Sequence, residues 1–228
     1  VDKGQTLAII GATGSGKTTL ASLIPRFYDA TAGTVLVDGL DVREYTFDAL
    51  YNKLGYVTQK AVLFSGTVED NVFFGQSAAE KTDASLQAAL SLSQAAEFVD
   101  KYPEKAAHPI AQLGRNVCGG QKQRLSIARA LARTPEILIF DDSFSALDYK
   151  TDATLREGLA KELPGTTKII VAQRISTIRN ADQILVLDRG EIAGLGTHDA
   201  LMASCTVYRE IAMSQLSEEE LKKGGASK

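Results

Sequence analysis

The sequence has few of the features that mark disulfide-rich, metal-binding or membrane-spanning proteins. Its 228 residues include two cysteines, two histidines and no tryptophan. Cys118 and Cys205 are too few for a disulfide framework or a metal-ligand cluster, which fits a reducing compartment. The longest apolar runs, such as residues 35–37 and 137–140, are far too short to cross a bilayer.

The charges of the chain are nearly balanced. It carries 25 basic and 28 acidic residues, a formal net charge of −3, and no strongly basic block. A nucleic-acid partner therefore has no support from charge. Hydrophobic residues at 44% and the length suit one globular domain with room for two lobes. Because the chain begins at Val1 rather than methionine, we expect a domain cut from a longer protein.

Short apolar segments alternate with helical patterns, which predicts an α/β fold with a mostly parallel sheet. The expected strands are residues 5–10, 33–39, 54–59, 137–140, 168–172 and 184–187. The expected helices are about residues 17–24, 83–92, 121–133 and 151–163, with a short helix capped by Thr197. We expect an α/β core over residues 1–75 and 134–213, a helical subdomain over 76–133, and a polar tail over 214–228 that is at most a frayed helix.

The segment GATGSGKT, residues 11–18, matches G-x-x-x-x-G-K-[ST] and lies between a predicted strand and a predicted helix. Such glycines let backbone N–H groups curl around phosphates, while the helix N-terminus adds positive potential. We expect Lys17 to reach the β- and γ-phosphates and the Thr18 hydroxyl to bind Mg²⁺. The strand–helix context disfavours the alternative, a glycine-rich turn that binds nothing. The predicted phosphate-binding residues are Gly11, Ala12, Thr13, Gly14, Ser15, Gly16, Lys17, Thr18 and Thr19.

Two adjacent acids, Asp141 and Asp142, end the apolar strand in ILIFDDSFSALD. Burying one carboxylate without a partner is costly, and burying two is worse. A metal ion would offset that cost, so we expect Asp141 to hold Mg²⁺ through its water shell. Asp142 would then face the γ-phosphate and orient or deprotonate an attacking water.

Five stretches, in the family's order, closely resemble the motifs of ATP-binding cassette (ABC) proteins, and the resemblance covers about residues 3–213. Besides the phosphate loop, residues 56–59 (YVTQ) look like the Q-loop, and residues 170–174 look like the switch strand. CGGQ resembles the signature, where the family usually has Leu-Ser-Gly-Gly-Gln, and SALD resembles the D-loop. These two motifs are Cys118, Gly119, Gly120 and Gln121, and Ser145, Ala146, Leu147 and Asp148.

The resemblance implies a P-loop ATPase fold with an inserted helical subdomain, and ATP and Mg²⁺ as cofactors. It also implies that Gln59 reaches the metal or the attacking water. The closest match is to exporters with fused membrane domains, carried by LFSGTVEDNV (63–72) and GTH (196–198). In such proteins two nucleotide-binding domains sandwich two ATPs between one phosphate loop and the other's signature. Closing and reopening of the pair drives the transmembrane domains, at the cytoplasmic face of the cell membrane.

Three departures from the family pattern concern the chemistry of hydrolysis. The family has Glu where this chain has Asp142, and removing one methylene withdraws the carboxylate by roughly 1.5 Å. The switch residue is Gln173 where the family has His, and an amide cannot relay a proton. Cys118 replaces a Ser of the signature, and a thiol is a weaker donor. Because the first two lie in one ATP site, they resemble the degenerate half of a heterodimeric exporter, with neutral drift in an adequate enzyme as the alternative.

Other expectations follow from what surrounds these motifs. The family stacks adenine on an aromatic residue upstream of the phosphate loop, and no aromatic residue precedes Gly11 here. We therefore expect an incomplete antiparallel sheet without that platform. His108 and His198 are expected to be surface or packing residues. Phe64 is expected either to line a groove for a membrane-domain helix or to be plain core.

Alternatives to the heterodimeric exporter remain at this stage. One is a homodimeric exporter with slow, symmetric hydrolysis. Another is a soluble ABC protein of translation or DNA repair, disfavoured because no duplicated cassette, coiled-coil insert or basic surface is visible. A phosphotransferase outside the family is disfavoured because no acceptor-binding lid is evident.

Overall fold

The computed structural model describes residues 1–76 and 81–215, so most of the predicted tail, residues 216–228, lies outside the described residues. The described chain forms two compact units. The first comprises Val1–Leu50 and the chain from Thr167 onward, and the second comprises Tyr51–Thr166.

The first unit is built around strand β1 (Thr6–Gly11), which is parallel to β8 (Thr167–Val171) on one side and to β9 (Gln183–Asp188) on the other. Ile9 of β1 lies level with Val171 of β8 on one side and with Leu185 of β9 on the other. β10 (Glu191–Gly196) extends this sheet antiparallel to β9. Strands β1, β8 and β9 are mostly buried, as expected for apolar runs in a parallel sheet that is covered on both faces.

Besides this sheet, the described part of the first unit contains a small hairpin and five helices, one of which continues into the second unit. Because both Arg189 and Gly190 have positive φ, the two-residue turn between β9 and β10 is of the type that matches strand twist. The Tyr45 hydroxyl donates to the Val37 carbonyl at 3.0 Å and thereby anchors the hairpin. The helices are α1 (Lys17–Leu23), α2 (Phe47–Lys53, which continues into the second unit), α8 (Ile175–Ile178), α9 (His198–Ser204) and α10 (Thr206–Gln215), beside the 3₁₀ turn η1 (Val42–Glu44) and the hairpin β2 (Leu36–Val37) and β3 (Leu40–Asp41).

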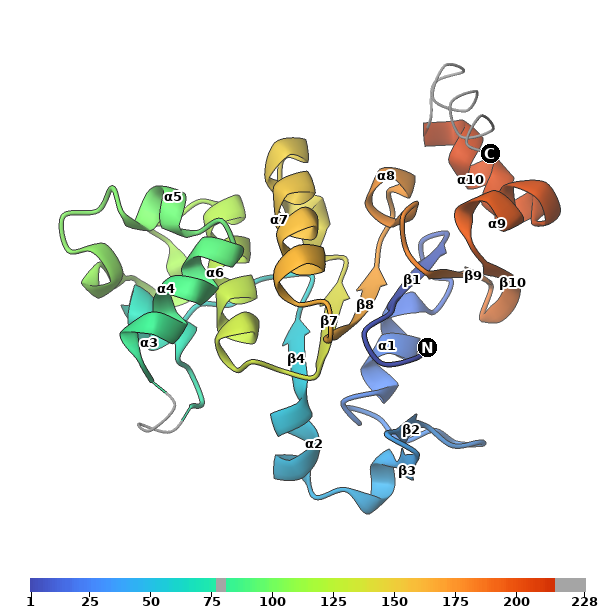
Figure 1. Ribbon diagram of the computed structural model, residues 1–228, viewed down its shortest axis with the longest axis horizontal. Helices are drawn as coiled ribbons and strands as arrows, with labels where there is room; N and C mark the ends of the chain where they lie inside the picture. Colours follow the sequence, from blue (N-terminus) through green and yellow to red (C-terminus); the bar gives the residue numbers. More distant parts are fainter. Residues whose placement is uncertain (77–80, 216–228) are drawn as a thin grey trace. The chain divides into compact units, whose positions relative to one another are not determined.

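The second unit combines two parallel strands, β4 (Leu54–Val57) and β7 (Ile137–Asp141), with a group of helices (Figure 1). Helix α6 (Gly119–Ala132) lies at the centre of this group, where it contacts α3, α4 and β4 and buries its apolar face. The other helices are α3 (Val68–Val72), α4 (Asp83–Leu92), α5 (Ala96–Val99) and α7 (Tyr149–Glu162), with the 3₁₀ turns η3 (Lys105–Ala107), η4 (Gln112–Gly114) and η5 (Ser143–Ala146), and the short pair β5 (Gly66–Thr67) and β6 (Pro109–Ile110).

The predicted α/β class with a mostly parallel sheet is confirmed, and most predicted elements lie within two residues of the observed ones. The strand predicted over residues 33–39 is shorter in the structure. Positive φ at Gly33, Asp38 and Gly39 turns the chain at both ends of this stretch, and the strand itself is Leu36–Val37, which pairs with β3. The sequence did not reveal β10 and α10. The subdomain boundaries at residues 76 and 133 stay a prediction.

In residues 1–76 and 81–215, no helix is both long and apolar enough to cross a membrane. The two histidines have packing roles within their own units. His108 stacks on Tyr102 with ring centroids 3.8 Å apart. His198, the first residue of α9, lies 2.8 Å from the buried Tyr208 hydroxyl through its Nδ1 atom.

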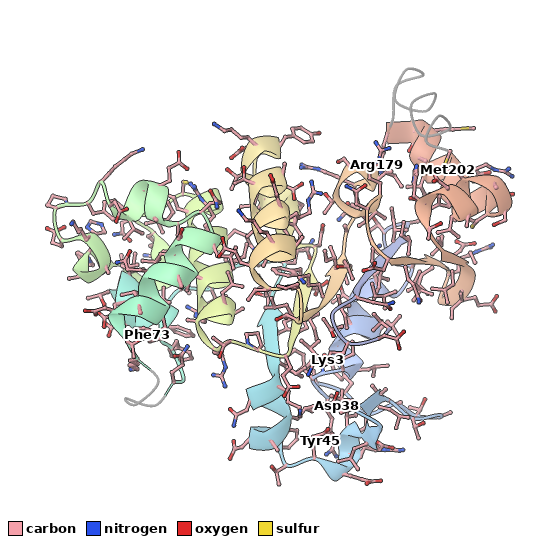
Figure 2. The ribbon with its side chains drawn as sticks, in the orientation of Figure 1. Lys3, Asp38, Tyr45, Phe73, Arg179 and Met202 are labelled. Atoms are coloured by element: carbon pink, nitrogen blue, oxygen red, sulfur yellow. The ribbon has the colours of Figure 1, made fainter. Side chains whose placement is uncertain are left out.

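His198 predicts a specific pH dependence of stability. Burial, and then the charge of Arg179 (labelled in Figure 2), lower the pKa of His198 below its ordinary value of 6.5, against a smaller opposing effect of Asp199. The unfolded state therefore takes up this proton first, and stability is lost as pH falls through the unfolded pKa. We expect the free energy of unfolding of the wild type to fall more steeply between pH 7.5 and 5.5 than that of His198→Gln, measured by urea titration. Equal slopes would contradict this assignment.

Candidate functional site

The predicted phosphate loop connects β1 to α1 in the first unit. Gly14 (φ 81°) and Gly16 (φ 98°) are in the left-handed region that glycine adopts without strain. The Lys17 ammonium donates to the carbonyls of Gly11 and Ala12, both at 2.8 Å. Thr18 and Thr19 are exposed at the start of α1. The loop thus presents a hydrogen-bonded cation and glycines in the left-handed region at a helix start, an arrangement suited to phosphate.

Close packing against β9 explains why the loop starts with glycine. A methyl group on Gly11 would collide with the backbone oxygen of Leu187 and lie 2.6 Å from Ser15 Oγ. The Ser15 carbonyl in turn accepts the Gly190 N–H at 3.2 Å, from the turn after β9. The base of the loop is therefore held by the neighbouring strand.

Gln173, the predicted switch residue, emerges at the same edge of the first unit's sheet. It follows β8, and β8 is parallel to and in register with β1. The carboxyl ends of parallel strands meet at one edge, where ligands of such sheets bind. The structure therefore brings Gln173 and the phosphate loop to one edge, with the exposed Gln173 side chain beyond β8.

The two acids at the end of β7 are buried in the second unit, with 4% of Asp141 and 6% of Asp142 exposed. Each accepts a hydrogen bond from a neutral group of the segment that begins in β4. Tyr56 donates its hydroxyl to Asp141 at 3.1 Å, and Gln59 donates its Nε2 to Asp142 at 2.9 Å. Burial, and then the Asp141 charge, raise the pKa of Tyr56 well above its ordinary value, so Tyr56 stays a donor at neutral pH. These bonds offset part of the cost of burying two carboxylates.

The backbone of Asp142 is also unusual. Its φ of 47° and ψ of 27° lie in the left-handed region, which costs most L residues about 1–2 kcal/mol and which Asp adopts more readily than most. Ser145 secures this conformation, because its hydroxyl donates to the Asp142 carbonyl at 2.7 Å. The position therefore favours a short polar side chain.

The predicted signature and D-loop lie beside each other in the second unit. Cys118 and Gly119 are exposed at the start of α6, where the Gln121 side chain accepts the Cys118 N–H at 3.0 Å. A methyl group on Gly120 would lie 3.5 Å from the Ala146 carbonyl oxygen, whereas one on Gly119 would meet nothing within 4 Å. The packing of this chain thus gives no reason for glycine at position 119.

The D-loop residues have local structural roles. Leu147 is buried, and Asp148 caps α7 by accepting the Thr151 N–H at 2.9 Å and the Thr151 hydroxyl at 2.7 Å. These hydrogen bonds, the backbone one first, lower the pKa of Asp148. Ser145 and Ala146 are exposed.

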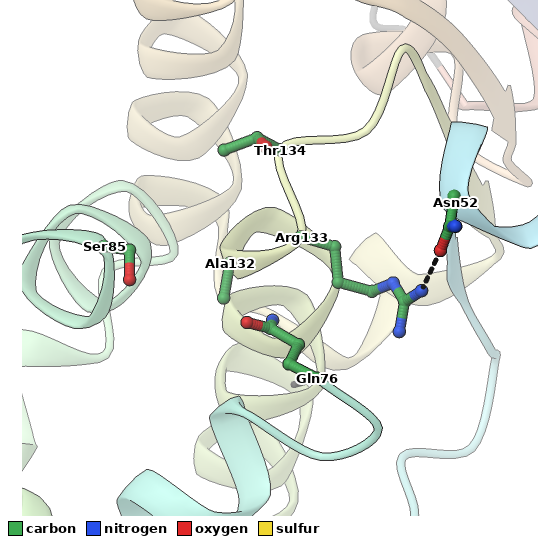
Figure 3. Close-up of a pocket in the computed structure, with 6 residues that line it drawn as sticks. All are labelled: Asn52, Gln76, Ser85, Ala132, Arg133 and Thr134. Atoms are coloured by element: carbon green, nitrogen blue, oxygen red, sulfur yellow. Dashed lines mark hydrogen bonds between the residues drawn. The ribbon is translucent and has the colours of Figure 1, made fainter. Parts of the chain in front are cut away.

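A polar pocket of about 390 Å³ lies elsewhere in the second unit (Figure 3). Arg133 lines it and donates to Asn52 Oδ1 at 3.3 Å, and the buried amide atoms of Gln76 have no hydrogen-bond partner among residues 1–76 and 81–215. None of the predicted site residues lines this pocket. Its remaining lining residues are Ser85, Ala132 and Thr134.

Sequence reasoning missed two residues that act on the predicted site. Tyr56 was identified only as part of the Q-loop, and its bond to Asp141 depends on the pairing of β4 with β7, which no local pattern in the sequence indicates. Gln215 bonds the backbone of Gln173 and Ile175 from α10. No pattern in the sequence indicates that contact.

Comparisons with known proteins support the resemblance to ABC proteins that these motifs indicate. A family model described as "ABC transporter" matches residues 1–145. An uncharacterised ABC transporter ATP-binding protein of Mycobacterium tuberculosis (strain ATCC 25618 / H37Rv) is 49% identical over 213 residues, covering 93% of this chain and 36% of that protein. The ATP-dependent lipid A-core flippase of Syntrophus aciditrophicus (strain SB) is 41% identical over 218 residues, covering 96% of this chain and 36% of the flippase.

A solved structure has the same fold. The structure of a bacterial Atm1-family ABC exporter with ATP bound matches with a TM-score of 0.89 and 37% sequence identity, over 94% of this chain and 38% of that one. The predicted P-loop ABC ATPase fold is therefore confirmed. The chain spans about a third of the length of the curated relatives it matches.

The packing of Gly11 predicts the effect of a single methyl group. Gly11→Ala should destabilise the chain by about 1–3 kcal/mol, because the colliding oxygen is backbone and cannot rotate away. That corresponds to a fall in Tm of about 2–4 °C for each kcal/mol. Gly165→Ala is the matched control, since a methyl group there meets nothing within 4 Å. Thermal unfolding by circular dichroism checks this, and equal melting temperatures for the two variants would refute it.

Proposed function

The chain belongs to the ABC transporter family, and we propose that it is the ATP-binding and hydrolysing domain that powers export by a membrane transporter, with impaired hydrolysis at its own site. The observation that carries this proposal is the phosphate loop, with Lys17 held by two carbonyls and Gly11 set against β9. The names of the flippase and exporter relatives support the direction of transport.

The proposal assigns a role to each polar group of the site. Lys17 binds the β- and γ-phosphates, and the loop N–H groups from Gly11 to Thr19 surround them. Mg²⁺ prefers oxygen ligands, and Thr18, Asp141 and Gln59 offer a hydroxyl, a carboxylate and an amide oxygen, so their donor chemistry fits this ion. When bound, Mg²⁺ neutralises phosphate charge.

The proposal of weak hydrolysis is based on the side chains of Asp142 and Gln173. Asp142 is the water-orienting carboxylate, shortened by one methylene and hydrogen-bonded to Gln59. A displacement near 1 Å can cost about a hundredfold in rate. Gln173 can hydrogen-bond the γ-phosphate but cannot relay a proton. Two weakened groups at one nucleotide favour a heterodimeric transporter, in which a different subunit supplies the active site, over a symmetric homodimer.

The proposed partner domain contacts the start of α6. Cys118 and Gly119 are exposed, and Gly119 has no neighbour in this chain that excludes a side chain. Glycine there suits close approach by a second nucleotide-binding domain with its ATP. Ser145 and Ala146 of the D-loop are exposed on the same unit.

An apolar surface on the second unit, formed by Val62, Phe64 and Phe74, is the proposed contact for the transmembrane domains at the cytoplasmic face of the membrane. These side chains are 43–50% exposed, and the two rings stack with centroids 4.3 Å apart. Arg129 lies 5.4 and 5.5 Å from the ring centroids and donates to the Val62 carbonyl at 3.0 Å. The buried Asn71 bonds both the N–H and the carbonyl of Phe64. A rigid, exposed aromatic pair of this kind suits docking of an apolar partner.

Phe64→Ala tests that surface in the complete transporter. We expect the variant to fold and to bind ATP with an affinity within about twofold of wild type, because the Phe64 side chain is 43% exposed and stacks on the ring of Phe74, which is also exposed. Substrate transported per ATP hydrolysed should fall at least about threefold, since loss of one anchor side chain typically costs more than about 1 kcal/mol of binding. Ile192→Ala, another exposed apolar residue, is the control. Loss of folding or of nucleotide binding in Phe64→Ala would show the assignment to be wrong.

Asp142 and Gln173 together test the impaired site. The double change Asp142→Glu with Gln173→His should raise ATP hydrolysis at this site by more than the product of the single effects, because both groups act on one water and one phosphate. Asp142→Glu carries the backbone cost of a left-handed position in the single and the double variant alike, so this cost does not explain a difference between them. The measurement is single-turnover hydrolysis in the complete transporter, with the partner's catalytic base removed.

Asp142→Asn is the matched control for this experiment. Asn tolerates the left-handed backbone and still accepts a hydrogen bond from Gln59, but it removes the carboxylate, so residual hydrolysis should fall to background. Turnover by the unmodified site at a rate comparable with the partner's would overturn the proposed impairment and favour the symmetric enzyme.

A further inference from the structure

One side chain of the C-terminal helix α10 bonds the backbone of the switch segment. The Gln215 amide oxygen accepts the Ile175 N–H at 2.9 Å, and its Nε2 donates to the Gln173 carbonyl at 2.7 Å. These two backbone groups flank Arg174 and lie beyond β8, which ends at Val171. A primary amide carries a donor and an acceptor side by side, so it matches a carbonyl and an N–H two residues apart.

The switch segment needs such a partner because it leaves the sheet. The Ala172 N–H still bonds the Ile9 carbonyl of β1, at 3.1 Å. Beyond it, Ile175 starts the four-residue helix α8, whose N-cap residue Arg174 makes no side-chain cap bond. The first N–H groups of a helix have no partner within it. Gln215 therefore caps α8 from a different helix and holds the backbone of Gln173 in the same contact.

The position of Gln215 is set by the packing of α10. Tyr208, Ala212 and Gln215 follow one another at i, i+4 and i+7, and so lie on one face of the helix. Tyr208 and Ala212 are fully buried, and α10 contacts α8, β1 and β9. The Tyr208 hydroxyl bonds His198 at 2.8 Å. The amide is thus presented from a helix that is fixed against the same sheet.

We propose that Gln215 is a positioning residue that sets the switch Gln173 against the γ-phosphate. This inference rests on the proposed function, in which Gln173 faces that phosphate. Gln173 and the phosphate loop share one sheet edge, so moving the Gln173 backbone changes its distance to the γ-phosphate. The contacts of Lys17 with the β-phosphate are unaffected. Gln215 therefore governs discrimination of ATP from ADP and the rate of hydrolysis, and not nucleotide binding in general.

Amide hydrogen exchange in the complete transporter tests the contact itself. Gln215→Ala should raise the exchange rate of the Ile175 amide about tenfold, because its acceptor is removed and the segment opens more readily. Met213→Ala is the matched control, since Met213 lies two residues earlier on α10 and is 61% exposed. It should leave that rate unchanged.

Nucleotide selectivity tests the positioning role, with the phosphate loop of the other domain inactivated. Gln215→Ala should lose about three- to tenfold in the ratio of ATP to ADP affinity, with ADP affinity within about twofold of wild type. Gln215→Glu should also lose selectivity at pH 7.5, because a carboxylate cannot donate to the Gln173 carbonyl. Its protonated form can, so selectivity relative to wild type at the same pH should recover toward pH 5. Gln215→Ala should show no such recovery.

The outcomes separate this inference from the proposed function. A wild-type protein that binds no ATP would overturn the proposed function and the role of Gln215 together. Where the wild type binds ATP, an unchanged Ile175 exchange rate in Gln215→Ala would overturn the positioning role alone. Faster exchange with wild-type ATP selectivity would overturn it as well. Faster exchange with lost selectivity, and acid recovery in Gln215→Glu, would establish it.

Discussion

The close approach of β1 to β9 is the constraint on which the rest of the first unit depends. No side chain fits at Gly11, because the Leu187 backbone oxygen occupies the space that a Cβ would need. The loop that starts there is anchored again by the bond from Gly190 to the Ser15 carbonyl. With β8 on the other side of β1, the phosphate loop, the β9–β10 turn and Gln173 all leave one edge of one parallel sheet. Backbone packing therefore positions the base of the loop.

The acids of the second unit illustrate how a buried charge is retained. Asp141 and Asp142 are almost fully buried, and a phenol and an amide donate a hydrogen bond to them without adding charge. Such hydrogen bonds replace part of the hydration that a buried carboxylate loses. The left-handed backbone of Asp142 adds a reason for Asp at a position where the family has Glu.

Two surface features of the second unit are not explained by packing within this chain. Phe64 and Phe74 stack on the surface over a half-buried Arg129, and Gly119 could carry a side chain without touching this chain. A folded domain gains little from exposing aromatic rings or from placing glycine in the first turn of a helix. Both features are consistent with surfaces that other domains cover, which is what the proposed function requires.

The sequence alone determined the α/β class, the phosphate loop and the site motifs, because each depends on local patterns: apolar periodicity, glycine spacing and acids at a strand end. It also placed Thr197 correctly as the cap of α9, where it accepts the Ala200 N–H. It could not reveal that Tyr56 bonds Asp141, that Asp142 has a left-handed backbone, or that Gln215 holds the backbone around Gln173. The contacts of Tyr56 and Gln215 depend on strand pairing and on helix packing between residues 40 to 85 positions apart. Local patterns predict which residues carry the chemistry, whereas only tertiary packing decides which groups hold them in place.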